Sequence, residues 1–138
     1  MRLVLDTNTA VSGLIWGGVL GRLIDAAAAG TAQIISSVLL LDELHDVLFR
    51  KKFAAQLAEQ GVDAADLFEG YAALVQLVVP AAIGPVILAD PDDDIVLATA
   101  VACGADLIVS GDAHLLGIRE FQGIPIVTPS AAVSRLAV

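Results

Sequence analysis

The sequence predicts an α/β protein in which a parallel sheet is covered by helices on both faces. Short apolar runs alternate along the chain with longer segments of helical periodicity, and this alternation is typical of strands joined by helical crossovers. A length of 138 residues suits one hydrophobic core. Because no linker, repeat or low-complexity segment interrupts the pattern, we expect residues 1–138 to form a single domain.

The first half of the chain is expected to supply three strands. Leu3–Leu5 is short and apolar, as a buried central strand requires. Residues 9–29 have mostly helical periodicity interrupted by glycines, and Gly30 is a suitable stop. The pair Ser36-Ser37 can cap the next helix. The remaining expected elements are a strand at 32–35, a helix from that cap to about Lys51, helices at 53–60 and 63–75, and a strand at 75–79.

The second half begins with an irregular segment, 81–93, which contains Gly84, Pro85 and Pro91. After it, the alternation of helix and strand resumes. The expected elements are a helix at 94–103, a strand at 105–109, a short helix at 113–116, a strand at 124–127 and a final helix at 130–136 capped by Ser130. Right-handed crossovers between such strands place ligands at their carboxyl ends, near the point where the strand order reverses.

Composition and charge narrow the possible functions. Hydrophobic residues make up 57% of the chain, enough to fill a core and leave apolar surface for a subunit interface. The 7 basic and 16 acidic residues give a net charge of −9. That charge argues against general nucleic-acid binding through a basic surface, but a nuclease whose carboxylates bind divalent metals remains possible. The cation cluster Arg50-Lys51-Lys52 is either a solvated helix end or a patch that contacts phosphates.

The chain carries no signal for secretion or membrane insertion. Met1-Arg2 is followed by three apolar residues before Asp6, and no segment is long and apolar enough to cross a bilayer. The single cysteine, Cys103, excludes an internal disulfide and is expected in the core. We therefore expect a cytoplasmic protein.

Four acidic residues stand where packing does not require a carboxylate. Asp6 and Asp112 come at the ends of apolar strands, Asp94 opens a helix, and Glu43 lies early on another helix. The first and fourth strands are expected neighbours at the reversal of strand order, so Asp6 and Asp112 should meet at one crevice. Carboxylates gathered without lysine or arginine repel one another unless a cation neutralises them.

Such a cluster of oxygen ligands suits Mg²⁺ or Mn²⁺, and the sequence therefore predicts a metal-dependent phosphodiesterase. Asp6, Asp94 and Asp112 are the expected direct ligands. Glu43 would bridge ions or bind one through water. Asn8 and Ser110 are expected to hydrogen-bond the carboxylates and hold them in place, and Thr7 either does the same or satisfies the backbone at the strand end.

Each of these residues also has an ordinary structural interpretation. An acid after a strand often caps the next helix, Glu43 alone would be a surface residue, and Asp92, Asp93 and Asp94 could form a charged first turn. His114 could touch substrate or metal-bound water, or simply lie at a helix start. A calcium loop is excluded because Ile95 stands where glycine is required. The spacing of the histidines and the single cysteine does not fit a zinc site.

Four motifs together resemble the PIN-domain family, and look most like the VapC-like toxins of bacterial type II toxin–antitoxin systems. In order they are Asp6-Thr7-Asn8, Leu41-Asp42-Glu43-Leu44, the acidic run Asp90 to Asp94 leading to Leu97-Ala98-Thr99-Ala100, and the segment Leu107 to Leu116. The resemblance covers Leu3 to about Val127. It implies that the family's four acids correspond to Asp6, Glu43, Asp94 and Asp112, with Asp92 and Asp93 as possible alternatives for the third.

The resemblance implies a three-layer α/β/α fold with a five-stranded parallel sheet in the order 3-2-1-4-5. It also implies a Mg²⁺- or Mn²⁺-dependent ribonuclease acting on single-stranded RNA, a homodimer, and a small cognate antitoxin that blocks the site. The acidic balance of the chain suggests local or selective RNA binding. The alternative is a PIN-like metal-binding or regulatory module without catalytic activity.

Overall fold

The structure of the chain, a computed structural model, describes residues 1–85 and 91–136, without the side chains of Pro91 and Asp92. The side chain of the predicted extra acid Asp92 and the motif residue Asp90 therefore lie outside the described part. The strands are β1 (Arg2–Leu5), β2 (Gln33–Ser36), β3 (Gln76–Leu77), β4 (Leu107–Val109), β5 (Glu120–Phe121) and β6 (Ile124–Val127). The helices are α1 (Thr7–Trp16), α2 (Gly18–Ala28), α3 (Val38–Leu48), α4 (Lys51–Glu59), α5 (Ala64–Leu74), α6 (Pro91–Cys103), α7 (Ala113–Ile118) and α8 (Pro129–Arg135).

A mostly parallel sheet runs through the centre of the molecule in the order β3-β2-β1-β4-β6-β5. β1 lies between β2 and β4 and is parallel to both. Leu3 pairs with Leu107 and Leu5 with Val109, so β1 and β4 end side by side. This confirms the predicted α/β class and the predicted contact between the first and fourth strands.

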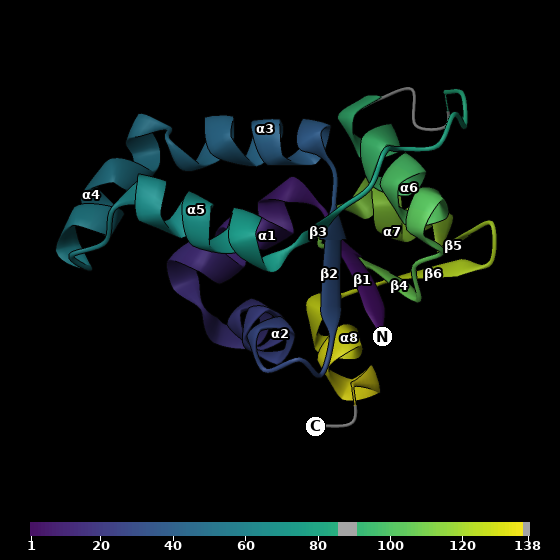
Figure 1. The fold of residues 1–138 in the computed structure, drawn as a ribbon, viewed down its shortest axis with the longest axis horizontal. Coiled ribbons are helices and arrows are strands. Elements are labelled where there is room, and N and C mark those ends of the chain that lie inside the picture. Colours follow the sequence, from purple (N-terminus) through teal and green to yellow (C-terminus); the bar gives the residue numbers. More distant parts are fainter. Residues whose placement is uncertain (86–90, 137–138) are drawn as a thin grey trace.

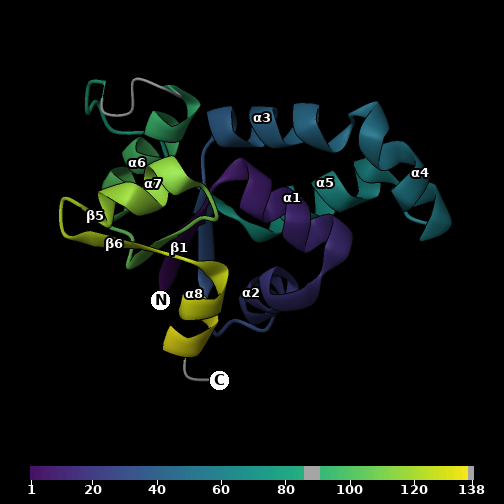
Figure 2. The ribbon, with the colours of Figure 1, turned by 180° about the vertical axis from the view of Figure 1, so that it is seen from behind.

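Two apolar cores lie on opposite faces of the sheet, which makes the fold three layers thick. Leu3 and Leu5 of β1 pack into the core formed with α1, α2, α3, α5 and α8. Val4, between them, faces the core formed with α6 and α7. Side chains alternate across a strand, and each face of β1 therefore needs its own helical cover. Figures 1 and 2 show α6 and α7 on one side of the sheet and α1, α3 and α5 on the other.

The predicted count of five strands was wrong, because a sixth strand lies at the edge. β5 pairs with β6 in antiparallel register, Phe121 opposite Ile124, across a two-residue turn. Both turn residues have positive φ, 49° at Gln122 and 83° at Gly123. Two successive positive φ values match the twist of a tight hairpin. Apart from this addition, the predicted order holds, with β6 as the predicted fifth strand.

The predicted helix at 9–29 is two helices that meet at Gly17. This residue has φ 69° and ψ −122°, a conformation that glycine adopts without a steric penalty. Among the described residues, no single helix has both the length and the apolar character needed to cross a membrane. α1 and α2 together have enough of both, but they are bent by 93° at their break.

The predicted start of the helix at Asp94 was also wrong. α6 begins at Pro91, where the fixed φ of proline suits the first helical position and its missing N–H is not needed. Asp93 and Asp94 therefore both lie in the first turn, about 100° apart around the axis. Near the C-terminus, Thr128 and not Ser130 caps α8, which starts at Pro129.

Candidate metal site and groove

Asp6 stands at the junction of β1 and α1. It is the residue after β1 and the N-cap of α1, with Oδ1 accepting a hydrogen bond from the backbone N–H of Thr9 at 2.7 Å. Only 5% of Asp6 is exposed. A buried carboxylate needs hydrogen bonds of this kind to replace its lost hydration. The strand end thus sets the position of Asp6, and the helix start sets its orientation.

Ser110, just after β4, connects the two predicted acids at the strand ends. Its hydroxyl donates to Oδ2 of Asp6 and accepts a hydrogen bond from the backbone N–H of Asp112 at 2.9 Å. Asp112 in turn caps α7 by accepting from the backbone N–H of His114 at 2.6 Å. The adjacent strands β1 and β4 therefore bring Asp6 and Asp112 to one crevice, as the sequence predicted.

A cavity of about 30 Å³ lies between these acids, and four carboxylate residues from different elements line it. Its lining consists of Asp6, Thr7, Asn8, Glu43, Asp93, Val96 and Asp112. Among the described residues that line it, none is lysine or arginine. The volume suits a single ion or water molecule. The fold thus gathers negative charge at one place with no fixed cation beside it.

The structure brings Asp93 to this cavity instead of the expected Asp94. Asp93 is buried, with 7% of its surface exposed, whereas Asp94 is half-buried and is not part of the lining. Asp93 is on the same face of α6 as the buried residues Val96, Leu97 and Ala100, at spacings of three, four and seven residues. Which of the acids bind metal stays a prediction.

The negative charge at the strand end also acts on Tyr71 of α5. Burial raises the pKa of the Tyr71 phenol, and the nearby Asp6 carboxylate raises it further. This tyrosine was not predicted from the sequence. Its position among apolar residues of a helix gave no signal that the fold would carry it toward Asp6.

The donor set fits a hard divalent cation. Carboxylate oxygens are preferred ligands of Mg²⁺ and Mn²⁺, and neutralisation by an ion would offset the repulsion between the acids. Thr7, which lines the cavity, is buried, and within the described part of the chain its Oγ1 has no hydrogen-bond partner. One oxygen or nitrogen each from Asp93, Asp112 and His114 also lie within 4.8 Å of one another, a spacing that could hold a metal ion.

A larger groove of about 280 Å³ adjoins the cavity and shares Asp6, Asn8 and Asp112 with it. Ser12 and Pro129 also line this groove, and the sequence analysis did not name them. Two signals could have identified them. Ser12 is one helical turn beyond the exposed Asn8, and Pro129 follows β6, whose carboxyl end lies beside that of β4.

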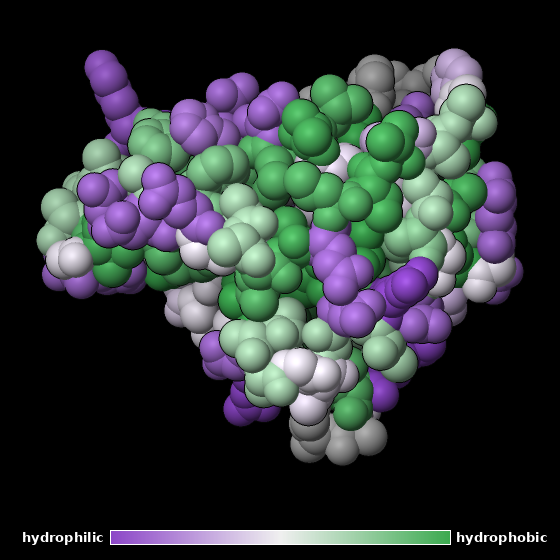
Figure 3. All heavy atoms as spheres, in the orientation of Figure 1, coloured by the Kyte–Doolittle hydropathy of each residue, from purple (hydrophilic) through white to green (hydrophobic). Residues whose placement is uncertain are grey.

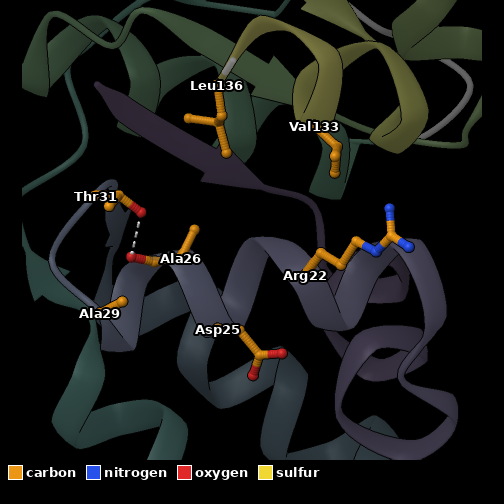
Figure 4. A pocket seen from close by; sticks show the side chains of 7 residues that line it. All are labelled: Arg22, Asp25, Ala26, Ala29, Thr31, Val133 and Leu136. Atoms are coloured by element: carbon orange, nitrogen blue, oxygen red, sulfur yellow. Dashed lines mark hydrogen bonds between the residues drawn. The ribbon is translucent and has the colours of Figure 1, made fainter. Parts of the chain in front are cut away.

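Another hollow, of about 460 Å³, lies elsewhere, between α2 and α8 (Figure 4). Arg22 and Asp25 are its charged residues, and Ala26, Val133 and Leu136 supply apolar surface. Figure 4 shows Arg22 at one end of the hollow and Asp25 on the far side of α2 from α8. This hollow holds no group of acids, so its size does not mark it as the reactive site.

Comparison with known protein families shows to which family the chain belongs. The profile of the PIN domain matches residues 2–114, and the chain belongs to the PIN-domain family. PIN domains are generally metal-dependent nucleases, in agreement with the acidic cavity at the ends of β1 and β4. No curated protein matches the chain.

Proposed function

We propose that this PIN domain is a metal-dependent endoribonuclease that cleaves single-stranded RNA and serves as the toxin of a toxin–antitoxin pair. The observation that carries the proposal is the meeting of Asp6, Glu43, Asp93 and Asp112 around one small cavity. Membership of the PIN-domain family supports nuclease chemistry in general. The RNA substrate and the toxin role rest on the resemblance of the four sequence motifs to VapC-like toxins.

Asp6, Asp93 and Asp112 would hold a divalent cation, Mg²⁺ or Mn²⁺, with Glu43 completing the ring of acids. When bound, the ion would activate a water molecule and stabilise the charge that develops on the phosphate. The chain itself orients the ligands. The Thr9 N–H and the Ser110 hydroxyl fix the two oxygens of Asp6, so its orientation is set before any ion binds.

The groove beside the cavity gives a single strand a place to lie. Asn8 and Ser12 offer hydrogen-bonding side chains along it, and Leu20 and Pro129 offer apolar surface for a base. With a net charge of −9 the protein would attract RNA poorly at long range. Binding would thus depend on these local contacts and favour selected sequences over RNA in general.

The proposal includes a cognate antitoxin, a homodimer and a location in the cytoplasm. Apolar side chains are well exposed near the start of α3 and at β3, at Val38 (62%), Leu77 (53%) and Val79 (85%). Figure 3 shows hydrophobic surface over the start of α3 and the segment after β3. Such a surface supports a protein partner, because exposed apolar groups of this size gain stability when they are covered.

The test is cleavage of a mixed RNA panel by purified protein in Mg²⁺, Mn²⁺ or EDTA, beside two variants. Asp6→Asn removes one carboxylate from the cavity and should abolish metal-dependent cleavage. Asp106→Asn removes an exposed acid just before β4, at the other end of the sheet, and should cleave like the wild type. Full cleavage by Asp6→Asn would refute the site. No cleavage by the wild type, despite metal binding, would favour the non-catalytic module.

A further inference from the structure

His114 is the residue beside the acids that the proposed nuclease leaves without a role. It is the second residue of α7, and its side chain is 58% exposed. Its Nδ1 lies 3.5 Å from Oδ1 of Asp112. One ligand atom each of Asp93, Asp112 and His114 lie within 4.8 Å of one another.

These three donors are close enough for one ion to bring them together. Ligands at about 2.1 Å from an octahedral ion lie roughly 3 Å apart when adjacent and roughly 4 Å apart when opposite. The distance of 3.5 Å between Nδ1 of His114 and Oδ1 of Asp112 lies between these two values, and it is longer than an ordinary hydrogen bond. A small rotation of the exposed imidazole would bring it to ligand distance.

The N-cap of α7 explains why the histidine stays near the carboxylate. Oδ1 of Asp112 accepts a hydrogen bond from the backbone N–H of His114 at 2.6 Å. The backbone of His114 is therefore held against this carboxylate whether or not a metal is bound. Only the side-chain torsions of His114 need to be ordered on binding, which keeps the entropy cost small.

We propose that His114 supplies a nitrogen ligand to the ion held by Asp93 and Asp112, and that the centre therefore selects Mn²⁺ over Mg²⁺. Imidazole is a good ligand for transition metals, whereas Mg²⁺ prefers oxygen. The inference rests on the metal site of the proposed function, which left the choice between the two ions open. According to this inference, His114, which is not one of the four cavity acids, determines the preference for Mn²⁺ over Mg²⁺.

The experiment uses the full chain without a histidine tag, stripped of metal, at a pH where imidazole is neutral. Calorimetric titrations with MnCl₂ and MgCl₂ compare the wild type with His114→Ala. His45→Ala is the matched control, since His45 is also exposed but stacks on Phe49 at the end of α3. Pulsed EPR of bound Mn²⁺ reports directly whether a nitrogen is coordinated. RNA cleavage is measured in parallel.

We expect His114→Ala to lower Mn²⁺ affinity by about tenfold or more and Mg²⁺ affinity by no more than about twofold. The nitrogen coupling should be present in the wild type and His45→Ala and lost in His114→Ala. An unchanged ratio of Mn²⁺ to Mg²⁺ affinity, or no nitrogen coupling in the wild type, would overturn the inference even if RNA were cleaved. Nitrogen-coordinated Mn²⁺ without cleavage would support the inference and refute the nuclease. Absence of metal binding would refute both.

Discussion

Asp106 and Asp112 flank the same strand, β4, but their surroundings differ. Before the strand, exposed Asp106 accepts a hydrogen bond from the backbone N–H of Arg2 at 2.7 Å, and the Arg2 guanidinium donates to the carbonyl of Cys103. After the strand, half-buried Asp112 shares a cavity with three other acids, and among the described residues no basic side chain lines it. Asp106 links the starts of β1 and β4. Asp112 instead lies close to other carboxylates, and their mutual repulsion does not help the protein to fold.

The difference indicates that the fold needs a helix-capping oxygen at Asp6 and Asp112 but does not need a negative charge there. Asparagine would keep the cap with less electrostatic repulsion. Acids that destabilise the metal-free protein are expected at sites of function, where the ligand offsets their repulsion. Mutation of the acids at the carboxyl ends of the strands should therefore change cleavage, whereas mutation of Asp106 should change stability. Their effects on the free energy of unfolding should have opposite signs.

The largest expected effect separates two neighbouring acids. Asp93→Asn should lower the metal-dependent cleavage rate by about 100-fold or more, because it removes a buried carboxylate from the cavity. Asp94→Asn, one residue on and outside the cavity lining, should change the rate by less than about threefold. Single-turnover cleavage at saturating Mn²⁺ measures both. The reverse result would restore Asp94 as the third acid.

The choice between Asp93 and Asp94 shows where prediction from sequence stops. The alternation of apolar runs predicted the parallel sheet and the strand order around β1, and the acids at the ends of β1 and β4 were correctly placed together. For the third acid, the motif favoured Asp94, whereas the fold buries Asp93 in the cavity and leaves Asp94 half-buried outside its lining. Which of these neighbouring carboxylates faces the sheet depends on how α6 packs, because successive residues point about 100° apart, and the acidic run alone does not reveal that packing.

Other features lacked any local signal. β5 is two residues long, and only its pairing with β6 defines it. The cavity itself depends on α3 bringing Glu43 to the ends of β1 and β4, a long-range contact that periodicity cannot reveal. Tyr71 is similar, since its proximity to Asp6 depends on how α5 packs against the sheet.

Stability should respond with opposite signs at the two ends. In EDTA, Asp6→Asn should leave the free energy of unfolding unchanged or raise it by about 1 kcal/mol, because asparagine is also a good N-cap and carries no charge. Asp106→Ala should lower it by about 0.5 to 1 kcal/mol through the lost hydrogen bond to Arg2. Urea unfolding measures both. A clear loss of stability in Asp6→Asn would mean that its charge supports the fold.

The raised pKa of Tyr71 provides a test of its burial, with a smaller contribution from the charge of Asp6. A phenol whose pKa is higher in the folded protein than in the unfolded chain contributes full stability below about pH 10, the unfolded value, and loses it as the pH rises toward the folded value. Stability should therefore fall above about pH 10 by up to about 1.4 kcal/mol per pH unit from this group. Tyr71→Phe should remove that part of the slope in urea unfolding between pH 8 and 11. If stability depended on pH equally in the wild type and Tyr71→Phe, the raised pKa of Tyr71 would be contradicted.

The smallest expected effect concerns the cations Arg50-Lys51-Lys52. The sequence left open whether they are a solvated helix end or a phosphate-contacting patch. α3 ends at Leu48, and Lys51 and Lys52 open α4, where positive charge opposes the helix dipole. The helix dipole therefore does not explain these two lysines, and Lys52 has a local contact, with its Nζ 5.0 Å from the centroid of the Phe53 ring. Contact of Lys51 with RNA phosphates stays a prediction that can be tested.

Lys51→Gln should accordingly raise the free energy of unfolding by about 0.3 to 1 kcal/mol. It should also weaken RNA binding and reduce the dependence of log K on log salt by about 0.7. Arg135→Gln is the matched control, because Arg135 lies in the last turn of α8, where a cation is favourable; it should lose a little stability and bind RNA normally. Fluorescence titrations at several salt concentrations decide between the two hypotheses. Equal salt dependence in Lys51→Gln and wild type would return the cluster to a solvated surface and confine RNA contacts to the groove at the carboxyl end of the sheet.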